Sequence, residues 1–293
     1  MFEQLGLIGC GLMGGSFSLA LKRAGLVKRV VGYSKSPEDL HLARELGVVD
    51  MAAPSAQMAA VDSDIVLLAV PVMASEATFK TVREMITPTT LLMDVGSTKR
   101  DVVDAARRVL RERFDCFVPA HPIAGREVSV VENADPDLYT GQQVILTPLE
   151  RTAQPQLEKA RALWTALGCT LREMTPEAHD AAFAAVSHLP HLLAFALIKA
   201  ISAQGAHGEA FLSMAGPGFR DFTRIAAADP AMWRDILVSN RQELLAQSEH
   251  FKRALTQLEK LIADSDGDTL QAQIEQISEL RATWRMNSSG KGR

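Results

Sequence analysis

The sequence predicts an α/β fold in two parts: a doubly wound, mostly parallel sheet at the N-terminus, followed by an all-helical region. Three observations predict it. A short apolar run near the N-terminus ends in a glycine-rich turn, and a helical pattern follows that turn. Short β-branched runs then alternate with helical patterns, and after Thr175-Pro176 only helical periodicity remains. We therefore expect domains at 1–175 and 176–286 and a flexible, polar tail at 287–293.

The glycine-rich turn carries Gly9, Gly11 and Gly14 in the spacing G-x-G-x-x-G. The first allows a sharp strand-to-helix turn, the second lets backbone approach a pyrophosphate, and the third lets the helix pack closely on the sheet. Together with Leu12 and Met13, which open the helix, they form our predicted cofactor site in a Rossmann-type dinucleotide-binding domain. The alternative is an ordinary tight turn.

Six strands are predicted in the first part, at 4–9, 29–33, 64–70, 90–94, 116–120 and 143–147. The third is almost entirely apolar, as a central parallel strand buried on both faces should be. Val70 and Pro71, where it ends, are assigned to the cofactor site. Helices are expected at 36–46 and 98–111, and a helix at 153–167 with a strand at 169–174 completes the domain.

Four helices are predicted in the second part, at 177–204, 218–228, 230–264 and 267–286. Pro176 and Pro230 occupy first-turn positions, where a missing N–H is tolerated. The long helices carry more apolar surface than one such bundle can bury on itself. We therefore expect a homodimer formed through the C-terminal helices.

Composition excludes several other classes of protein. The chain has 293 residues, 47% of them hydrophobic, and a net charge of −4 without a basic tract, so we expect neither nucleic acid nor a membrane as partner. No apolar stretch reaches the roughly 18–20 residues of a spanning helix. The nearest, 189–201, is short and contains Pro190 and His191. Three cysteines without metal spacing suit a reducing cytoplasm.

The stretch after the second strand bears on the choice of cofactor. NAD-selective domains place an acidic residue about 20 positions after the glycines, but here no carboxylate precedes Glu38. Ser34, Lys35 and Ser36 offer one positive charge and two hydroxyls, so the sequence favours NADP, with NAD as the alternative. Ser36 also fits the N-cap of the next helix, and both interpretations can hold together.

Two segments follow strands at the carboxyl edge of the predicted sheet, where ligands of such folds bind. In the first, Ser97 or Thr98 fits a helix N-cap and also points a hydroxyl toward the cofactor crevice. In the second, His121 is placed as a general base of near-neutral pKa. A solvated loop histidine is the alternative.

The helical part adds further candidates. His188 and His191 lie three apart on one helix face, but no third ligand cluster accompanies them, so we predict no metal site. A glycine-rich helix entry carries Arg224, and arginine grips carboxylates through paired N–H donors. The alternative for this arginine is a surface ion pair with Asp221 or Asp229.

Five ordered segments resemble the prephenate/arogenate (cyclohexadienyl) dehydrogenase family of tyrosine biosynthesis. They are residues 9–16, 94–99, 121–125, 187–191 and 216–226. The resemblance implies oxidative decarboxylation: a hydride leaves C4 of the cyclohexadiene ring for the nicotinamide, and carbon dioxide leaves C1. It also implies that His121 takes the proton of the C4 hydroxyl and that Ser97 orients both groups.

The same resemblance implies that Arg224 binds a substrate carboxylate, with His191 lining the pocket and Asp221 supporting the arginine. Trp233 is expected near the active site, around the dimer interface. The loop after Gly125 departs from the family pattern, so Arg126 is assigned either to the substrate carboxylate or to a cofactor phosphate.

Two other functions stay open at this point. A β-hydroxyacid dehydrogenase is expected to place a catalytic lysine early in the helical domain, but Lys199 lies outside a glycine-lysine motif. A non-catalytic nucleotide sensor needs the glycine turn alone. The sequence does not choose between prephenate and arogenate.

Overall fold

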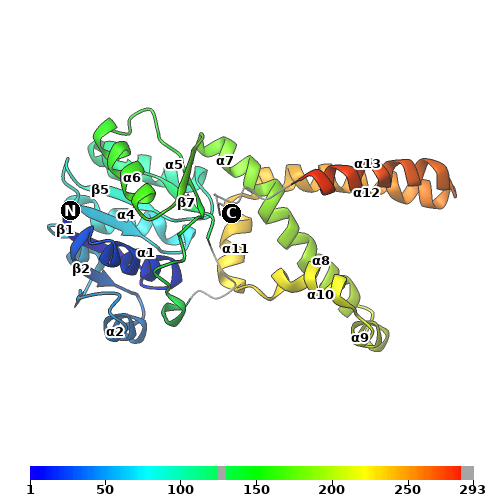
Figure 1. Ribbon diagram of the computed structural model, residues 1–293, viewed down its shortest axis with the longest axis horizontal. Coiled ribbons are helices and arrows are strands. Elements are labelled where there is room, and N and C mark those ends of the chain that lie inside the picture. Colours follow the sequence, from blue (N-terminus) through cyan, green and yellow to red (C-terminus); the bar gives the residue numbers. More distant parts are fainter. Residues whose placement is uncertain (125–129, 285–293) are drawn as a thin grey trace, which may run out of the picture.

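The computed structural model describes residues 1–124 and 130–284. Arg126, the predicted tail at 287–293 and the last two residues of the helix predicted at 267–286 lie outside the described residues. Figure 1 shows the sheet with its covering helices at one end of the molecule, and a long helical pair projecting from the other.

Within the described chain, the main sheet has six parallel strands in the order β3-β2-β1-β4-β5-β6. Their bounds are Phe2–Ile8 (β1), Val27–Tyr33 (β2), Met51–Ala52 (β3), Ile65–Leu68 (β4), Leu91–Asp94 (β5) and Phe117–Val118 (β6). The predicted doubly wound sheet is confirmed. The exposed two-residue edge strand β3 was not predicted, because it is too short to show a pattern. The order reverses between β1 and β4, which opens a crevice at the carboxyl edge.

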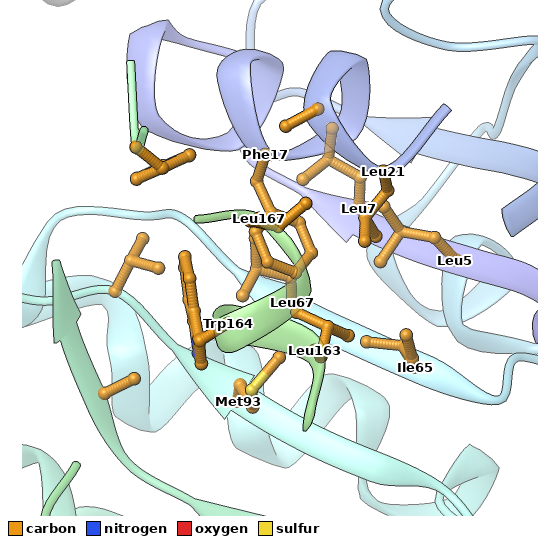
Figure 2. Packing of buried hydrophobic residues seen from close by; sticks show 14 of the residues in the cluster. Leu5, Leu7, Phe17, Leu21, Ile65, Leu67, Met93, Leu163, Trp164 and Leu167 are labelled. Carbon is orange, nitrogen blue, oxygen red and sulfur yellow. The ribbon is translucent and has the colours of Figure 1, made fainter. Parts of the chain in front are cut away.

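In the part of the chain that the structure describes, six α-helices connect these strands or follow them. They are Leu12–Arg23 (α1), Pro37–Glu45 (α2), Ala56–Ala60 (α3), Ser75–Val82 (α4), Arg100–Leu110 (α5) and Gln154–Ala166 (α6). Successive residues of the central strand β4 enter opposite cores: Ile65 and Leu67 join one cluster, and Val66 and Leu68 the other. This alternation is what burial on both faces requires. Figure 2 shows the first cluster, with Phe17 of α1 and Trp164 of α6 packed together over the strands.

A second, three-stranded sheet was not predicted. It contains Ala120–Pro122 (β7), Gln143–Leu146 (β8) and Thr170–Glu173 (β9), with β7 antiparallel to β8 and β8 parallel to β9. The single strand predicted at 116–120 is therefore wrong. The chain leaves the main sheet at Pro119, which has no N–H to donate to a ladder. His121 consequently lies inside β7 and not in a loop.

The C-terminal part is helical, as predicted. Its α-helices are Pro176–Phe183 (α7), Leu189–Ser202 (α8), Ala206–Ser213 (α9), Pro217–Thr223 (α10), Pro230–Ser239 (α11), Arg241–Ala263 (α12) and Gly267–Thr283 (α13). The one long helix predicted at 230–264 breaks at Asn240, and α9 was not predicted. Figure 1 shows α12 and α13 as the projecting antiparallel pair.

A π-helical turn at Ala184–His188 joins α7 to α8 in one continuous helix. The helix predicted at 177–204 is therefore confirmed as one continuous helix, which ends at Ser202. The wider turn changes the hydrogen-bond pattern just before the proline, whose missing N–H then leaves the helix unbroken. Among the described residues, Pro176–Ser202 is one helix long and apolar enough to span a membrane by length and composition, with a mean hydropathy of 1.8. The expectation that no apolar stretch reaches the length of a spanning helix is therefore wrong, and the core helices of soluble proteins pass the same test.

Candidate active site

The glycine turn forms a cradle at the carboxyl edge of β1. Gly9 has a φ of +96°, and a Cβ on it would lie 2.2 Å from the carbonyl oxygen of Ala69. A Cβ on Gly14 would lie 2.1 Å from the Gly9 carbonyl oxygen. Helix α1 begins at Leu12, and its N-cap, Gly11, offers no side chain to the first-turn N–H groups. A helix N-terminus without a side-chain cap, next to a turn that leaves no room for a Cβ, fits the pyrophosphate of a dinucleotide.

Val70 and Pro71 follow β4 on the other side of the crevice, where Ala69 N–H donates to the Ile8 carbonyl at 2.8 Å. Met13 lies in the first turn of α1, and its carbonyl accepts from the Tyr139 hydroxyl at 2.6 Å. Inside the turn, burial raises the pKa of the Cys10 thiol to about 12. The thiol is therefore protonated at neutral pH and is no nucleophile.

The segment Ser34–Ser36 caps the next helix, as one of the two interpretations predicted. Ser36 Oγ accepts from Asp39 N–H at 3.0 Å and donates to the Glu38 carboxylate at 3.1 Å. Ser34 Oγ accepts from Ser36 N–H at 3.3 Å, while Lys35 is exposed. The Ser36 hydroxyl is thus already engaged within the protein.

The loop after β5 differs from its prediction. Neither Ser97 nor Thr98 caps α5, which begins at Arg100 without a side-chain bond from its N-cap. The carboxylate of Asp180, on α7, accepts from the backbone N–H groups of Lys99 and Arg100 at 2.8 and 2.9 Å. Thr98 bonds instead to Ser239 at 3.0 Å. Ser97 is half-buried, and within the described chain no hydrogen bond joins it to His121.

His121 is buried, with 9% of its surface exposed. Its Nδ1 lies 2.8 Å from Nε2 of His179, and its ring lies 4.7 Å from the Phe183 ring. Burial, then the neighbouring charges of His179, Lys99 and His188, hold the pKa of His121 well below its usual 6.5. The predicted near-neutral pKa is therefore wrong, because β7 carries this histidine into the protein.

His179 links His121 to a carboxylate. Its Nδ1 lies 2.8 Å from Asp180 Oδ1. Burial alone would raise the pKa of Asp180, but hydrogen bonds from His179 and from the backbone of Arg100 and Lys99 outweigh it and lower that pKa. An ionised carboxylate only accepts, so Nδ1 of His179 donates to it and Nε2 of a neutral His179 accepts. Nδ1 of His121 must then donate to His179, which leaves His121 Nε2 free to take a proton.

His179 and Asp180 were not predicted from the sequence. The signal available for them was a His-Asp pair on the first turns of an apolar helix, at positions that turn out to be buried. Nothing local connects that pair with His121, 58 positions earlier.

His188 and His191 lie on two sides of Trp233. The His191 and Trp233 rings stack with centroids 3.4 Å apart and 20° between their planes, and the His188 ring meets Trp233 edge-on at 6.2 Å. Asn240 Nδ2 donates to His188 Nδ1 at 3.0 Å and to the Asp180 carbonyl at 2.8 Å. His191 and Trp233 are thereby joined through His188 and Asn240 to Asp180, which contacts His179 and through it His121.

Arg224 lies in the 3-10 turn Arg224–Ala227 that follows α10 and packs against α8. Asp221 was expected to support it, but the Asp221 carboxylate pairs with Nε of its exposed neighbour Arg220 at 3.2 Å. Support of Arg224 by Asp221 therefore stays a prediction.

Comparison with known proteins follows the same division of the chain. Residues 17–173 match the family model described as prephenate dehydrogenase, nucleotide-binding domain, and residues 175–276 match prephenate dehydrogenase, dimerization domain. The prephenate dehydrogenase of Bacillus subtilis is 36% identical over 278 residues, which are 92% of this chain and 73% of the relative. The cyclohexadienyl dehydrogenase of Zymomonas mobilis is 32% identical, with 96% of each chain covered.

Among solved structures, prephenate dehydrogenase from A. aeolicus in complex with hydroxyphenyl propionate and NAD+ superposes with a TM-score of 0.89. It is 36% identical, and the match covers 96% of this chain and 98% of that one. The two family matches together span most of the sequence, and two relatives exceed 30% identity over nearly all of it. The chain therefore belongs to the prephenate dehydrogenase family and is an NAD(P)-dependent oxidoreductase.

Proposed function

We propose that this protein oxidatively decarboxylates prephenate, arogenate or both, as a step of tyrosine biosynthesis, with His121 as the general base. The observation that carries the proposal is the chain of contacts from His121 through His179 to Asp180. It fixes the tautomer in which His121 Nε2 is unprotonated and ready to accept, beside the edge of the sheet that fits a dinucleotide.

His121 has to hold the proton of the substrate hydroxyl only temporarily. A dinucleotide held at Gly9, Gly11 and Gly14 would supply, through its nicotinamide, the acceptor for the hydride of C4 of the substrate ring. His121 Nε2 takes the proton of the C4 hydroxyl, carbon dioxide leaves C1, and the ring electrons move to the oxygen at C4. The same nitrogen then returns its proton to this oxygen, so a phenol forms without net proton release. A base buried from water suits this exchange, because no solvent proton takes part.

Asp180 and His179 stabilise the protonated form of His121. When His121 holds the proton it is an imidazolium inside the protein, which burial disfavours. The hydrogen-bonded His179 spreads that charge toward the Asp180 carboxylate, in the manner of a carboxylate that stabilises a catalytic imidazolium. The low pKa of His121 keeps the free enzyme in the accepting form at neutral pH.

The remaining site residues are assigned by the family resemblance. We assign Arg224 to a substrate carboxylate, His191 and Trp233 to the wall beside it, and Ser97 to the C4 hydroxyl. Ser97 lies between Gly96 and Thr98 in a loop held to β5 and to Asp180, so its place is fixed from both sides. Arg126 keeps its two possible assignments, the substrate carboxylate or a cofactor phosphate.

We favour NADP as the cofactor, with fewer protein groups for its 2′-phosphate than the sequence predicted. The Ser36 hydroxyl is engaged with Glu38 and Asp39, so Ser34 and the exposed Lys35 are the groups left for a 2′-phosphate. A higher kcat/KM with NAD than with NADP would overturn this assignment.

A homodimer through the C-terminal helices is supported by the match to the dimerization domain. It is also supported by large apolar side chains that one copy leaves exposed. Examples are Val186, Met214, Leu245, Ile262 and Leu280, each more than 60% exposed. Such surface normally becomes buried between subunits.

The test follows reduced-cofactor absorbance with prephenate and arogenate, each with NAD and with NADP, and the His121→Asn variant beside the wild type. We expect turnover with at least one combination, and none in the variant although it still binds cofactor. A wild type inactive in all four, yet active on a β-hydroxyacid, would replace the proposal with the alternative enzyme class. Near-normal kcat in the variant would remove His121 from the mechanism.

A further inference from the structure

A buried ion pair lies beside His121 and has no part in the chemistry described so far. Lys99 is fully buried, and its Nζ lies 2.6 Å from Asp94 Oδ2, in a carboxylate that is itself 3% exposed. Taking two charges out of water is expensive, and apolar residues of the same size often stabilise a protein as well or better. Stability alone is thus a weak explanation for this pair.

The Asp94 carboxylate joins two segments of the site. Its Oδ2 accepts from Gly96 N–H at 2.9 Å and from Lys99, so it closes the loop that carries Ser97. Its Oδ1 accepts at 3.2 Å from the N–H of Ala120, the residue before His121. The Asp94 side chain, at the end of β5, therefore binds both the loop that carries Ser97 and the strand β7 that carries His121.

Neighbouring atoms leave the Asp94 side chain and the loop that it binds little room to move. A Cβ on Gly96 would lie 2.9 Å from Asp94 Oδ2 and 3.0 Å from Val72 Cγ1. The backbone N–H of Lys99 donates to Asp180 Oδ1, so the lysine is held at both ends by carboxylates of the site. Three chain segments, the loop, β7 and α7, are thereby fixed relative to one another.

We propose that Asp94 is a positioning residue that sets the distance between Ser97 and His121, and that the Lys99 ammonium holds this carboxylate in place. The proposal rests on the proposed function, since it concerns the alignment of that base with its substrate. A displacement of about 1 Å at such a place is enough to lower a rate by about 100-fold.

Lys99 also contributes charge. The titratable groups that face His121 are His179 from α7, His188 from the π-helical turn and Lys99 from the loop, and each of them lowers its pKa after burial itself. Removing the lysine charge alone would therefore raise the pKa of His121. The acid limb of the kcat/KM profile would move to higher pH, which a purely structural role would not cause.

The test compares Asp94→Asn, Lys99→Met and the double variant. Each single change leaves one buried charge without its partner, so we expect a lower unfolding temperature from either. The double variant removes both charges and keeps both shapes, so it should lose less stability than either single variant. The amide oxygen that Asp94→Asn introduces can still accept from Ala120 N–H, whereas the bonds to Gly96 N–H and to the side chain at position 99 are lost.

For the double variant we expect a kcat about 100-fold below wild type and little change in the KM for cofactor. For Lys99→Met we expect the acid limb of the kcat/KM profile at higher pH. Glu173→Gln, which removes the distant pair with Arg161, serves as the control and should keep wild-type kinetics. A double variant with kcat within about threefold of wild type, or an unmoved acid limb in Lys99→Met, would overturn the proposal. An inactive wild type would instead overturn the proposed function.

Discussion

The Asp180 carboxylate accepts the first backbone N–H of helix α5, that of Arg100, at 2.9 Å. The two residues lie 80 positions apart, and α5 belongs to the sheet domain whereas Asp180 lies at the start of the helical region. The start of a helix has unpaired N–H groups and a positive dipole end, so a carboxylate is stabilised there. The same carboxylate ends the chain from His121. Docking of the helical region on α5 and orientation of the base thus depend on one side chain.

Replacing that carboxylate by an amide tests both roles. Asp180→Asn keeps one accepting oxygen but loses the charge and one of the two backbone bonds. We expect a loss of about 1–2 kcal/mol in unfolding free energy, as for a removed helix cap, and a kcat lower by at least about 100-fold. Urea unfolding and steady-state kinetics measure the two effects.

Arg100→Ala is the matched control for Asp180→Asn. It removes the guanidinium contact with Glu243 but leaves the backbone N–H that binds Asp180. We expect its kcat to stay near the wild-type value. If Asp180→Asn also kept wild-type kcat and lost only stability, the carboxylate would be a helix cap with no part in orienting the base.

The fold of the N-terminal part was predictable because its signals are local. The glycine spacing and the apolar run of β4 are each contained in a few consecutive residues, and both are confirmed. The division at Pro119 was not predictable in this way. It depends on β7 finding its partner in β8, some 25 residues later, and the proline only permits the change of sheet.

The residues of the candidate site were likewise predictable only where the signal is local in the sequence. His121 and His191 stand in recognisable segments, and the structure connects them by contacts through His188 and Asn240. The partners that determine their state were not predictable. Asp180 reaches Lys99 across 81 positions, and the π-helical turn has no simple sequence pattern. The low pKa of His121 likewise follows from burial, which a single loop motif does not report.

Buried histidines predict a loss of stability in mild acid. Their pKa values lie below the usual 6.5 in the folded protein, and that of His188 falls to about 4, mainly through burial. The unfolded chain therefore binds more protons than the folded one between those values, and stability falls as pH drops from about 6.5 toward 4. His188 alone accounts for on the order of 3 kcal/mol by the end of that range.

Urea midpoints at several pH values between 7.5 and 4.5 measure this dependence. We expect a flat region above about pH 7 and a steady decline below pH 6.5. In His188→Gln the decline should be shallower, because one of the groups that protonate on unfolding is gone. A wild-type midpoint that stays constant down to pH 5 would contradict the burial of these rings.

The glycine cradle predicts a specific failure of cofactor binding. A methyl group on Gly14 would lie 2.1 Å from the Gly9 carbonyl oxygen and 2.9 Å from Ala69 Cβ, so α1 must move away from the turn. We expect Gly14→Ala to raise the cofactor Kd at least about 10-fold, since backbone groups at the helix start no longer meet the pyrophosphate. Isothermal titration with NAD and NADP measures it. Gly267→Ala is the control, because a Cβ there meets open space.

The stacked pair His191–Trp233 allows binding of substrate to be separated from stability. Trp233 is 7% exposed and packs in a small core with Ala228 and Ile236, so Trp233→Ala should lose about 3–5 kcal/mol, whereas Trp233→Phe should keep most of the packing. His191 is only half-buried and donates from Nδ1 to the Ser187 carbonyl at 2.9 Å, so His191→Asn should change stability little.

If both rings line the substrate site, Trp233→Phe and His191→Asn should each raise KM for the substrate with kcat less affected, because the interactions they supply are made before the transition state. The double variant should show a coupling of about 0.5–1.5 kcal/mol in kcat/KM, as expected of rings in contact. Additive effects would mean that the stack holds α8 against α11 without shaping the site. Unchanged KM in both single variants would mean that the substrate binds away from His191 and Trp233.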